Sequence, residues 1–215
     1  LPFLFILGII GGLIFFQPDL GSLAVILAMA FIVYFAAGAS IKHLLGVGAL
    51  GSFLFFIAIQ AAPYRAARLT TFLHPELDPQ GIGYQINQAL LGIGSGGFFG
   101  RGFGHSLQKF EYLPEVIGDS IFAVMAEELG FFLVIPFLAL LGFWFSRGID
   151  IAEQAPDPFA RYLVIGCLGW IGIQMIMNIG SILGLLPLTG VTLPFVSYGG
   201  TSMTMTLFAV GIMLN

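Results

Sequence analysis

The final 54 residues of the chain, 162–215, carry no charged side chain, and this run constrains the fold more than any other feature. A helix crosses a membrane with about 20 apolar residues, so the run is too long for a single span. The string LLPLTGVTLP at 185–194 places two prolines and a glycine where they would end a helix. We therefore predict two membrane-spanning helices here, at 162–185 and 193–215.

The composition excludes a water-soluble globule. Hydrophobic residues make up 58% of the 215 residues and charged residues 8%, whereas a soluble domain has about 25% charged residues. Seven basic residues against eleven acidic ones give a net charge of −4. Because this leaves no basic surface to bind phosphates, nucleic acid is excluded as a partner. The single cysteine, Cys167, lies in an apolar run and is interpreted as a small hydrophobic residue.

Four further apolar runs have the length of a membrane span. They lie at 1–16, 20–41, 44–64 and 120–146, and they are continuously apolar, which disfavours the alternating pattern of a β-barrel. The sequence therefore predicts an all-α membrane protein, a polytopic helical bundle with six spans that forms a single membrane domain over 1–215. Since the chain begins inside an apolar run without an initiator Met, we also expect further segments upstream.

Basic residues in short loops predict which side of the membrane each loop faces. They are Lys42, Arg147 and Arg161. By the positive-inside rule, the loops 38–43 and 146–161 that contain them are cytoplasmic. The short loops near Asp19 and Thr189 have no basic residue. Alternating spans then place these two loops on the outer face together with the long segment 65–119.

This extracytoplasmic loop, 65–119, is a quarter of the chain but contains half of its charged residues. A loop of this length is usually functional or disordered. Apolar residues recur at helical spacing over 84–94, opposite polar ones such as Gln85. We therefore expect a short amphipathic helix in the headgroup zone.

Cations on the outer face are candidates for binding an anionic headgroup: Arg65, Arg68, Arg101 and Lys109. Two arginines at i, i+3, such as Arg65 and Arg68, can clamp a phosphate, but they can equally extend to lipid headgroups. The pattern alone leaves both roles open. No HExxH, CxxC or P-loop motif is present, so the sequence predicts no metal or nucleotide site of those kinds.

Three acidic residues lie at or inside the fourth expected span. Asp119 lies at its start, where it could cap the helix or act as a base. Glu127 and Glu128 lie about two turns further on, where an ionised carboxylate facing lipid would cost roughly 2.5 to 3.5 kcal/mol. We expect both to face protein or water and to play a supporting role.

Three strings of the sequence resemble the SEDS family of bacterial shape, elongation, division and sporulation proteins. They are QPDLGS at 17–22, GYQINQALLGIGSGGFFGRGFGHSLQKFEYLPEVIGDSIFAVMAEELGF at 83–131 and NIGSILGLLPLTGVTLPFVSYGGTS at 178–202. The string QKFEYLPE at 108–115 is more similar to the division and sporulation members than to the elongation members. The family has about ten spans, so the resemblance implies that the first four or so are missing here.

The resemblance implies a peptidoglycan glycosyltransferase that polymerises lipid II at the outer face of the bacterial cytoplasmic (inner) membrane during cell division. The implied partners are lipid II, a class B penicillin-binding protein transpeptidase, other proteins of the division machinery and the membrane itself. The family's catalytic aspartate follows an LPE motif in a D-x-I-F context, and Asp119 of GDSIF matches it. The neighbours Ile117, Gly118 and Ser120 differ from the His-Thr and Phe of many members.

Polymerisation needs a base near the acceptor hydroxyl and positive charge near the leaving pyrophosphate. We assign Asp119 as general base, with the four cations and Glu115 as substrate-binding candidates. Lys109 ranks first among the cations because it lies in the family-like string, ten residues before Asp119. A divalent cation such as Mg2+ could assist the leaving group, although the sequence contains no dedicated set of ligands for it.

Two alternatives remain open at this point, a lipid II flippase and a non-catalytic division scaffold. A flippase would gather polar groups across the depth of the bilayer. Apart from Glu127 and Glu128, the expected spans carry no charge, and the ionisable groups gather in the outer loop. This distribution favours an outward-facing polymerase.

Overall fold

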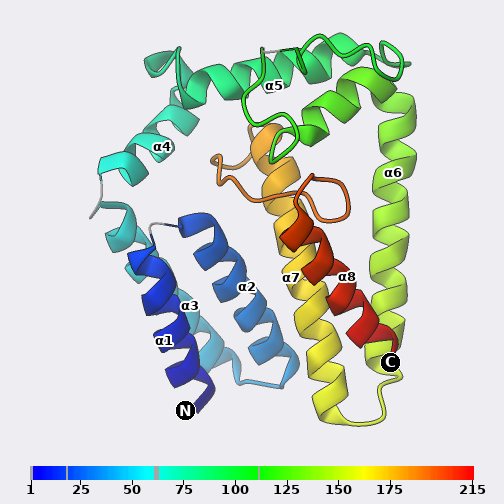
Figure 1. The fold of residues 1–215 in the computed structure, drawn as a ribbon. Coiled ribbons are helices and arrows are strands. Elements are labelled where there is room, and N and C mark those ends of the chain that lie inside the picture. Colours follow the sequence, from blue (N-terminus) through cyan, green and yellow to red (C-terminus); the bar gives the residue numbers. More distant parts are fainter. Residues whose placement is uncertain (1, 18, 61–62, 111) are drawn as a thin grey trace. The chain divides into compact units, whose positions relative to one another are not determined.

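The computed structural model describes residues 2–17, 19–60, 63–110 and 112–215 (Figure 1). These residues form helices and loops, with no strand among them. The helices are α1 (Pro2–Phe16), α2 (Leu20–Ala36), α3 (Ile41–Gln60), α4 (Pro63–Leu73), the short 3-10 helix η1 (Pro75–Leu77), α5 (Ile82–Gly96), α6 (Ile121–Glu153), α7 (Pro158–Ile182) and α8 (Gly200–Leu214). The all-α architecture expected from the sequence is confirmed.

The helices match the apolar runs with several differences at their ends. By length and composition, α6 and α7 can each cross a membrane, and α1, α2, α3 and α8 are shorter apolar helices. The chain beyond α3 forms the separate helix α4, which begins at Pro63. The ends of two expected spans, at residues 1 and 61–62, lie outside the described residues. The number of spans stays a prediction.

The chain divides into two units. Unit 1 comprises Leu1–Ala66, Arg147–Ile173 and Phe208–Asn215, and unit 2 comprises Ala67–Ser146 and Gln174–Leu207. Unit 1 therefore holds α1 to α3 and the connection between α6 and α7, while unit 2 holds the long loop and most of α6.

In unit 1, α2 packs between α1 and α7. The rings of Phe3 and Tyr34 stack with centroids 5.8 Å apart, which joins α1 to α2. Gly166 and Gly169 of α7 face Val33 and Ile32 of α2, respectively. The carboxyl end of α2 therefore lies beside the amino-terminal half of α7.

This packing brings two connections to the same end of unit 1 (Figure 1). One joins α2 to α3, just before Lys42, and the other joins α6 to α7, at 154–157. The second connection is shorter than the expected loop 146–161 because α6 continues to Glu153, before Pro156. Asp157 then caps α7 by accepting a 2.8 Å hydrogen bond from the backbone N–H of Ala160.

In unit 2, α6 has a sharp kink at Gly130, whose φ of 66° and ψ of 177° suit glycine alone. The kink breaks the helical hydrogen bonds, and the glycine-rich loop after α5 replaces them. The carbonyls of Glu127 and Glu128 accept from the N–H groups of Arg101 (2.9 Å) and Gly102 (3.1 Å). Below the kink, the N–H groups of Phe131 and Phe132 donate to the loop carbonyls of residues 97 and 98, at 3.0 and 2.9 Å.

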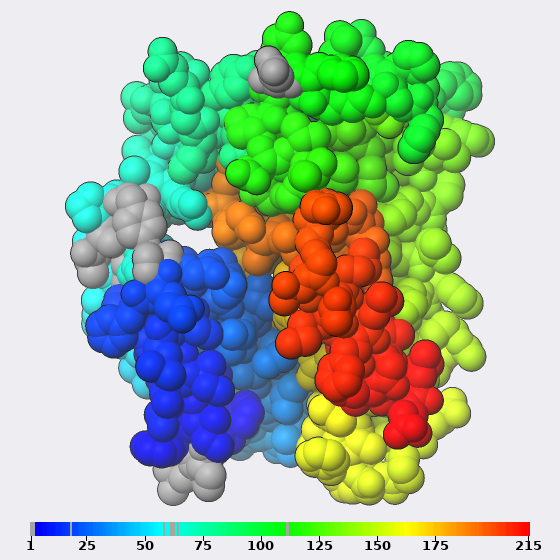
Figure 2. Space-filling view, in the orientation of Figure 1, coloured from blue at the N-terminus to red at the C-terminus, as the bar shows by residue number. Residues whose placement is uncertain are grey.

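Glycines allow the loop to approach α6 this closely. A side chain at Gly96 would collide with the carbonyl of Ala126, and one at Gly100 with the carbonyl of Glu128. The buried stripe of α5, which includes Ile86 and Ala89, runs toward the same contact. The space-filling view shows α5 and the following loop as one continuous layer (Figure 2). The amphipathic helix expected at 84–94 is confirmed as a helix, and its place in the headgroup zone stays a prediction.

The positive-inside argument makes a testable prediction about Lys42 and Glu76, which are both exposed. In a Cys167→Ser background, single cysteines at these two positions should be labelled by membrane-impermeant maleimide from opposite sides. The position of Lys42 should react only after permeabilisation, and that of Glu76 in intact cells. Labelling of both positions from one side would contradict the predicted topology.

Candidate functional site

Asp119 lies in the last turn of the long loop, just before α6. Its Oδ1 accepts hydrogen bonds from Ser120 Oγ (3.3 Å) and from Gln85 Nε2 of α5 (3.4 Å). Gln85 Nε2 also donates to Ser120 Oγ at 3.0 Å, so the three side chains form a closed set. Asn178 of α7 donates to the backbone carbonyl of Asp119 at 2.7 Å. Elements that are far apart in the sequence therefore position this carboxylate.

The second carboxylate oxygen, Oδ2, faces Gly190. A Cβ atom added to Gly190 would lie 3.9 Å from Oδ2, and the residue has a φ of 73°. The turn around Thr189 thus lies beside the end of the long loop, as the predicted topology requires. That this side is the outer one stays a prediction.

The surroundings of Asp119 raise its pKa above the ordinary value for an aspartate. Burial is the largest cause, because it disfavours the charged carboxylate, and the nearby charge of Glu115 acts in the same direction. The hydrogen bond from Ser120 and the positive charge of Arg68 oppose this rise in pKa. The structure therefore brings Asp119, Glu115 and Arg68 into one electrostatic neighbourhood.

Helix capping is the structural alternative for Asp119. A capping carboxylate would accept a hydrogen bond from a backbone N–H in the first turn of the helix. The carboxylate of Asp119 accepts from the side chains of Gln85 and Ser120, and it makes no hydrogen bond to a backbone N–H of α6, all of whose residues are described. This geometry gives the capping interpretation no support.

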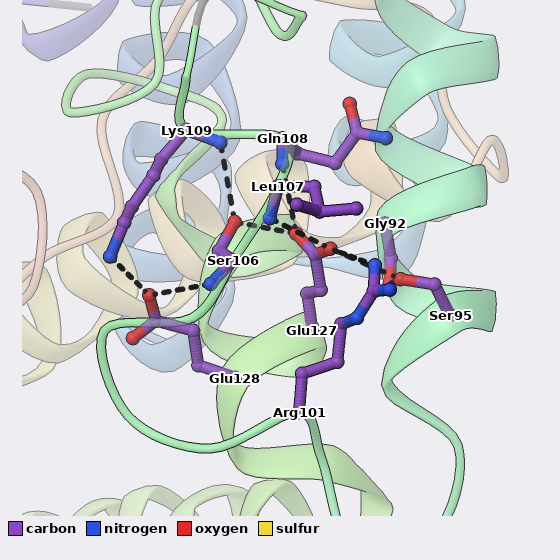
Figure 3. A network of polar contacts seen from close by, with 9 residues as sticks. All are labelled: Gly92, Ser95, Arg101, Ser106, Leu107, Gln108, Lys109, Glu127 and Glu128. Carbon is purple, nitrogen blue, oxygen red and sulfur yellow. Dashed lines mark hydrogen bonds and ion pairs between the residues drawn. The ribbon is translucent and has the colours of Figure 1, made fainter.

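Glu127 is the centre of a second polar cluster (Figure 3). The side chain is fully buried, and its two oxygens accept hydrogen bonds from five groups. The donors are Ser95 Oγ (3.2 Å), Arg101 Nη1 (3.1 Å), Ser106 Oγ, the N–H of Leu107 (3.1 Å) and the N–H of Gln108 (3.2 Å). One carboxylate thus joins α5, α6 and the loop.

Glu128 makes the neighbouring part of the same cluster. It accepts hydrogen bonds from Lys109 Nζ at 2.8 Å and from the N–H of Ser106 at 3.3 Å. Lys109 Nζ also donates to the carbonyl of Gly104 at 2.6 Å. Both glutamates therefore face protein, as expected for carboxylates inside an apolar helix.

The four candidate cations differ in their contacts. Arg101 and Lys109 each form an ion pair with a glutamate of α6. Arg65 lies in unit 1, where it is buried, donates to the carbonyl of Phe15 at 3.2 Å and lies 4.7 Å above the ring of Phe15. Arg68 is exposed, and its charge acts on Asp119. Substrate binding by each of the four stays a prediction.

Sequence reasoning did not identify two polar residues around Asp119, Gln85 and Asn178. The sequence could have identified Gln85, because it lies on the polar face of the expected amphipathic helix, in the same loop as the candidate site. Asn178 lies in a long uncharged run. An amide there predicts a buried hydrogen bond but does not indicate its partner.

Clusters of metal-ligating side chains bear on the divalent cation considered from the sequence. Within the described part of the chain, no group of three or more His, Cys, Asp or Glu side chains comes close enough together to hold a metal ion. A role for a divalent cation stays a prediction.

The sequence as a whole matches a family model named for FtsW, RodA and SpoVE and described as "Cell cycle protein", over residues 1–215. The chain is 47% identical to Stage V sporulation protein E of Bacillus subtilis strain 168, over 93% of this chain and 54% of that protein. It is 42% identical to the Probable peptidoglycan glycosyltransferase FtsW of Trichlorobacter lovleyi, over 100% of this chain and 56% of that protein. The chain thus spans about half the length of these curated relatives.

Solved structures resemble the fold. A chain from a peptidoglycan synthase complex, described as coordinating polymerization and crosslinking, matches with a TM-score of 0.75 and 33% identity, over 95% of this chain and 57% of that chain. The rod shape determining protein RodA of Thermus thermophilus matches with a TM-score of 0.61 and 33% identity, over 95% of this chain and 51% of that chain.

The cluster around Glu127 predicts a large effect on stability. Glu127→Ala should lower the free energy of unfolding by about 3 kcal/mol, because it leaves Arg101 and buried N–H groups without an acceptor. Asp150→Ala is the matched control, since it removes an exposed i, i+3 pair with Arg147, which is worth about 0.5 kcal/mol at most. Thermal unfolding in lipid nanodiscs measures both, and equal shifts would contradict a structural role for Glu127.

Proposed function

This chain belongs to the FtsW/RodA/SpoVE family of cell cycle proteins, and from that membership we propose that the protein is a peptidoglycan glycosyltransferase. It polymerises lipid II into glycan strands at the outer face of the bacterial cytoplasmic membrane during cell division. Relatives named as probable peptidoglycan glycosyltransferases, 38 to 45% identical to this chain, support the proposal. Because the chain spans about half of their length, the activity is proposed for the complete protein.

The observation that carries the proposal is the environment of Asp119. Gln85 and Ser120 hold one carboxylate oxygen, and the other faces Gly190, which has no side chain. A base needs this combination of a fixed position and a free oxygen that a hydroxyl can reach. The raised pKa of Asp119 also makes its carboxylate a stronger base than an ordinary aspartate.

In the proposed reaction, the 4-hydroxyl oxygen of the acceptor sugar attacks the anomeric carbon of the donor. The bond from this carbon to the pyrophosphate oxygen breaks, and the pyrophosphate leaves with the electron pair. Asp119 takes the proton of the attacking hydroxyl. An α-linked donor gives a β-linked glycan by one inverting displacement, so no second carboxylate is needed as a nucleophile.

Positive charge is needed where the pyrophosphate leaves. Arg68 is favoured by its exposure and by its electrostatic effect on Asp119. Lys109, the first choice from the sequence, would have to exchange Glu128 for a phosphate oxygen. A divalent cation such as Mg2+ would depend mainly on oxygens of the substrate.

The proposed partner is a class B penicillin-binding protein that crosslinks the new strands. The solved complex that resembles this fold is a peptidoglycan synthase described by both polymerization and crosslinking, and this supports the pairing. Other division proteins are further expected partners. A flippase or a scaffold would not need a base beside an outward-facing loop.

The role of Asp119 as general base is tested by removing its ability to accept a proton. Asp119→Asn keeps the shape of the side chain but cannot take the proton, so lipid II polymerisation should fall by about 10² to 10⁴-fold. The measurement uses the complete protein with its transpeptidase partner and purified lipid II, and thermal stability is recorded on the same sample. A stable Asn variant with normal polymerisation would remove the general base from the proposal, and transport of lipid II without polymerisation would favour a flippase.

The two charges that act on Asp119 should shift its pKa in opposite directions when removed. Arg68→Ala removes a charge that lowers its pKa, so the pKa should rise and the acid limb of the pH–rate profile should move to higher pH. Glu115→Gln removes a charge that raises the pKa, so the acid limb should move to lower pH. Profiles of kcat against pH for both variants check this. Shifts in the same direction would show that another group limits the rate.

A further inference from the structure

Three consecutive backbone carbonyls precede α6, and each accepts a hydrogen bond from the C-terminal part of unit 2. The carbonyl of Ile117 accepts from the N–H of Tyr198 at 2.8 Å. The carbonyl of Gly118 accepts from Ser197 Oγ at 2.6 Å, and that of Asp119 accepts from Asn178 Nδ2 at 2.7 Å. The peptide groups at and just before Asp119 are therefore fixed by residues between 59 and 81 positions away.

The two side-chain donors are themselves held in place. Asn178 is fully buried, and its Nδ2 also donates to the carbonyl of Val191 at 2.8 Å. Ser197 is 4% exposed, and its Oγ accepts a 2.7 Å hydrogen bond from the N–H of Leu193. Each side chain thus connects Asp119 or its neighbour to the segment 191–197. Neither donor makes a hydrogen bond to the carboxylate, whose described partners are Gln85 and Ser120.

The backbone on the other side of these carbonyls is fixed as well. The N–H groups of Gly118 and Ser120 both donate to the carbonyl of Glu115, at 3.0 and 3.3 Å. The peptide groups around Asp119 are therefore bound from two directions. With the backbone held, Asp119 can still rotate about its side-chain torsions, and the hydrogen bonds from Gln85 and Ser120 restrict this rotation.

Two residues in unusual backbone conformations border this contact. Glu115 has a φ of 50° and Phe195 a φ of 68°, in the left-handed region that disfavours residues other than glycine. Such conformations persist where surrounding contacts over-determine them, and they cluster at functional sites. The ring of Phe195 packs edge-on against Trp144, with centroids 5.3 Å apart. The segment that donates from Ser197 is thereby anchored to α6.

From this geometry we infer that Asn178 and Ser197 are positioning residues for the reaction proposed above, on which this inference rests. They act through Asp119 by fixing its backbone, so that the carboxylate stays in reach of the acceptor hydroxyl. An error of about 1 Å in the position of a reacting group can cost roughly 10²-fold in rate. The effect should therefore fall on kcat, because both residues are buried and act through the backbone at Asp119.

The test compares variants of Ser197 in the complete protein with its transpeptidase partner and purified lipid II. Ser197→Ala should lower kcat by about 10- to 100-fold while KM changes by less than about twofold. Ser197→Thr keeps the hydroxyl and should restore most of the rate. If Ser197→Ala does not fold, Ser197→Cys takes its place, because it keeps the side-chain volume but donates only weakly.

Thr206→Val is the matched control. Thr206 is a buried hydroxyl of α8 that donates to the carbonyl of Ser202 in its own helix at 2.8 Å. Its loss should cost stability comparable to that of the Ser197 variant and leave kcat per folded molecule unchanged. A normal kcat for the Ser197 variant, or equal losses in the Ser197 and Thr206 variants, would overturn the positioning role.

Asp119→Asn, measured in parallel, separates this inference from the proposed function. If Asp119→Asn is inactive and Ser197→Ala has normal kcat, the positioning role alone fails. If Asp119→Asn is fully active, the general base is wrong and the positioning role fails with it. Loss of kcat in both variants, with rescue by Ser197→Thr, supports both.

Discussion

The fold of unit 2 depends on the replacement of hydrogen bonds at the kink in α6. In an apolar environment every backbone polar group needs a partner, and the break at Gly130 removes the helical ones. The loop after α5 supplies four substitutes, from Arg101 and Gly102 above the break and from residues 97 and 98 below it. This exchange fixes the loop against the helix, and the positions of both glutamates follow from it.

The charged groups before the kink form two clusters with different properties. Glu127 and Glu128 each form an ion pair with a cation of the loop, so this cluster has little net charge. The partners of both carboxylates are thus residues of the protein itself. Asp119, at the start of the same helix, has no such ion pair within the described residues, and the exposed Arg68 influences it only through its charge. The first arrangement stabilises a loop, while the second leaves a carboxylate able to react.

The sequence predicted the features that depend on local pattern. Helical spacing over 84–94 identified α5, whose buried side includes Ile86 and Ala89. The kink inside the run 120–146 was missed, because a single Gly130 in an apolar helix carries no signal by itself. The pairing of Lys109 with Glu128 and the contact of Asn178 with Asp119 depend on how distant segments pack, which residue spacing does not encode.

Hydrogen-bond saturation distinguishes the three carboxylates that lie at or just inside the start of α6. Glu127 is fully buried and receives five hydrogen bonds, so an acceptor hydroxyl could reach it only by displacing part of the loop. Glu128 is bound to an ammonium group that would compete for the same oxygen. Asp119 keeps Oδ2 facing a glycine, and burial raises its pKa. A base must be held firmly and yet retain a free lone pair, and of these three carboxylates Asp119 best meets both conditions.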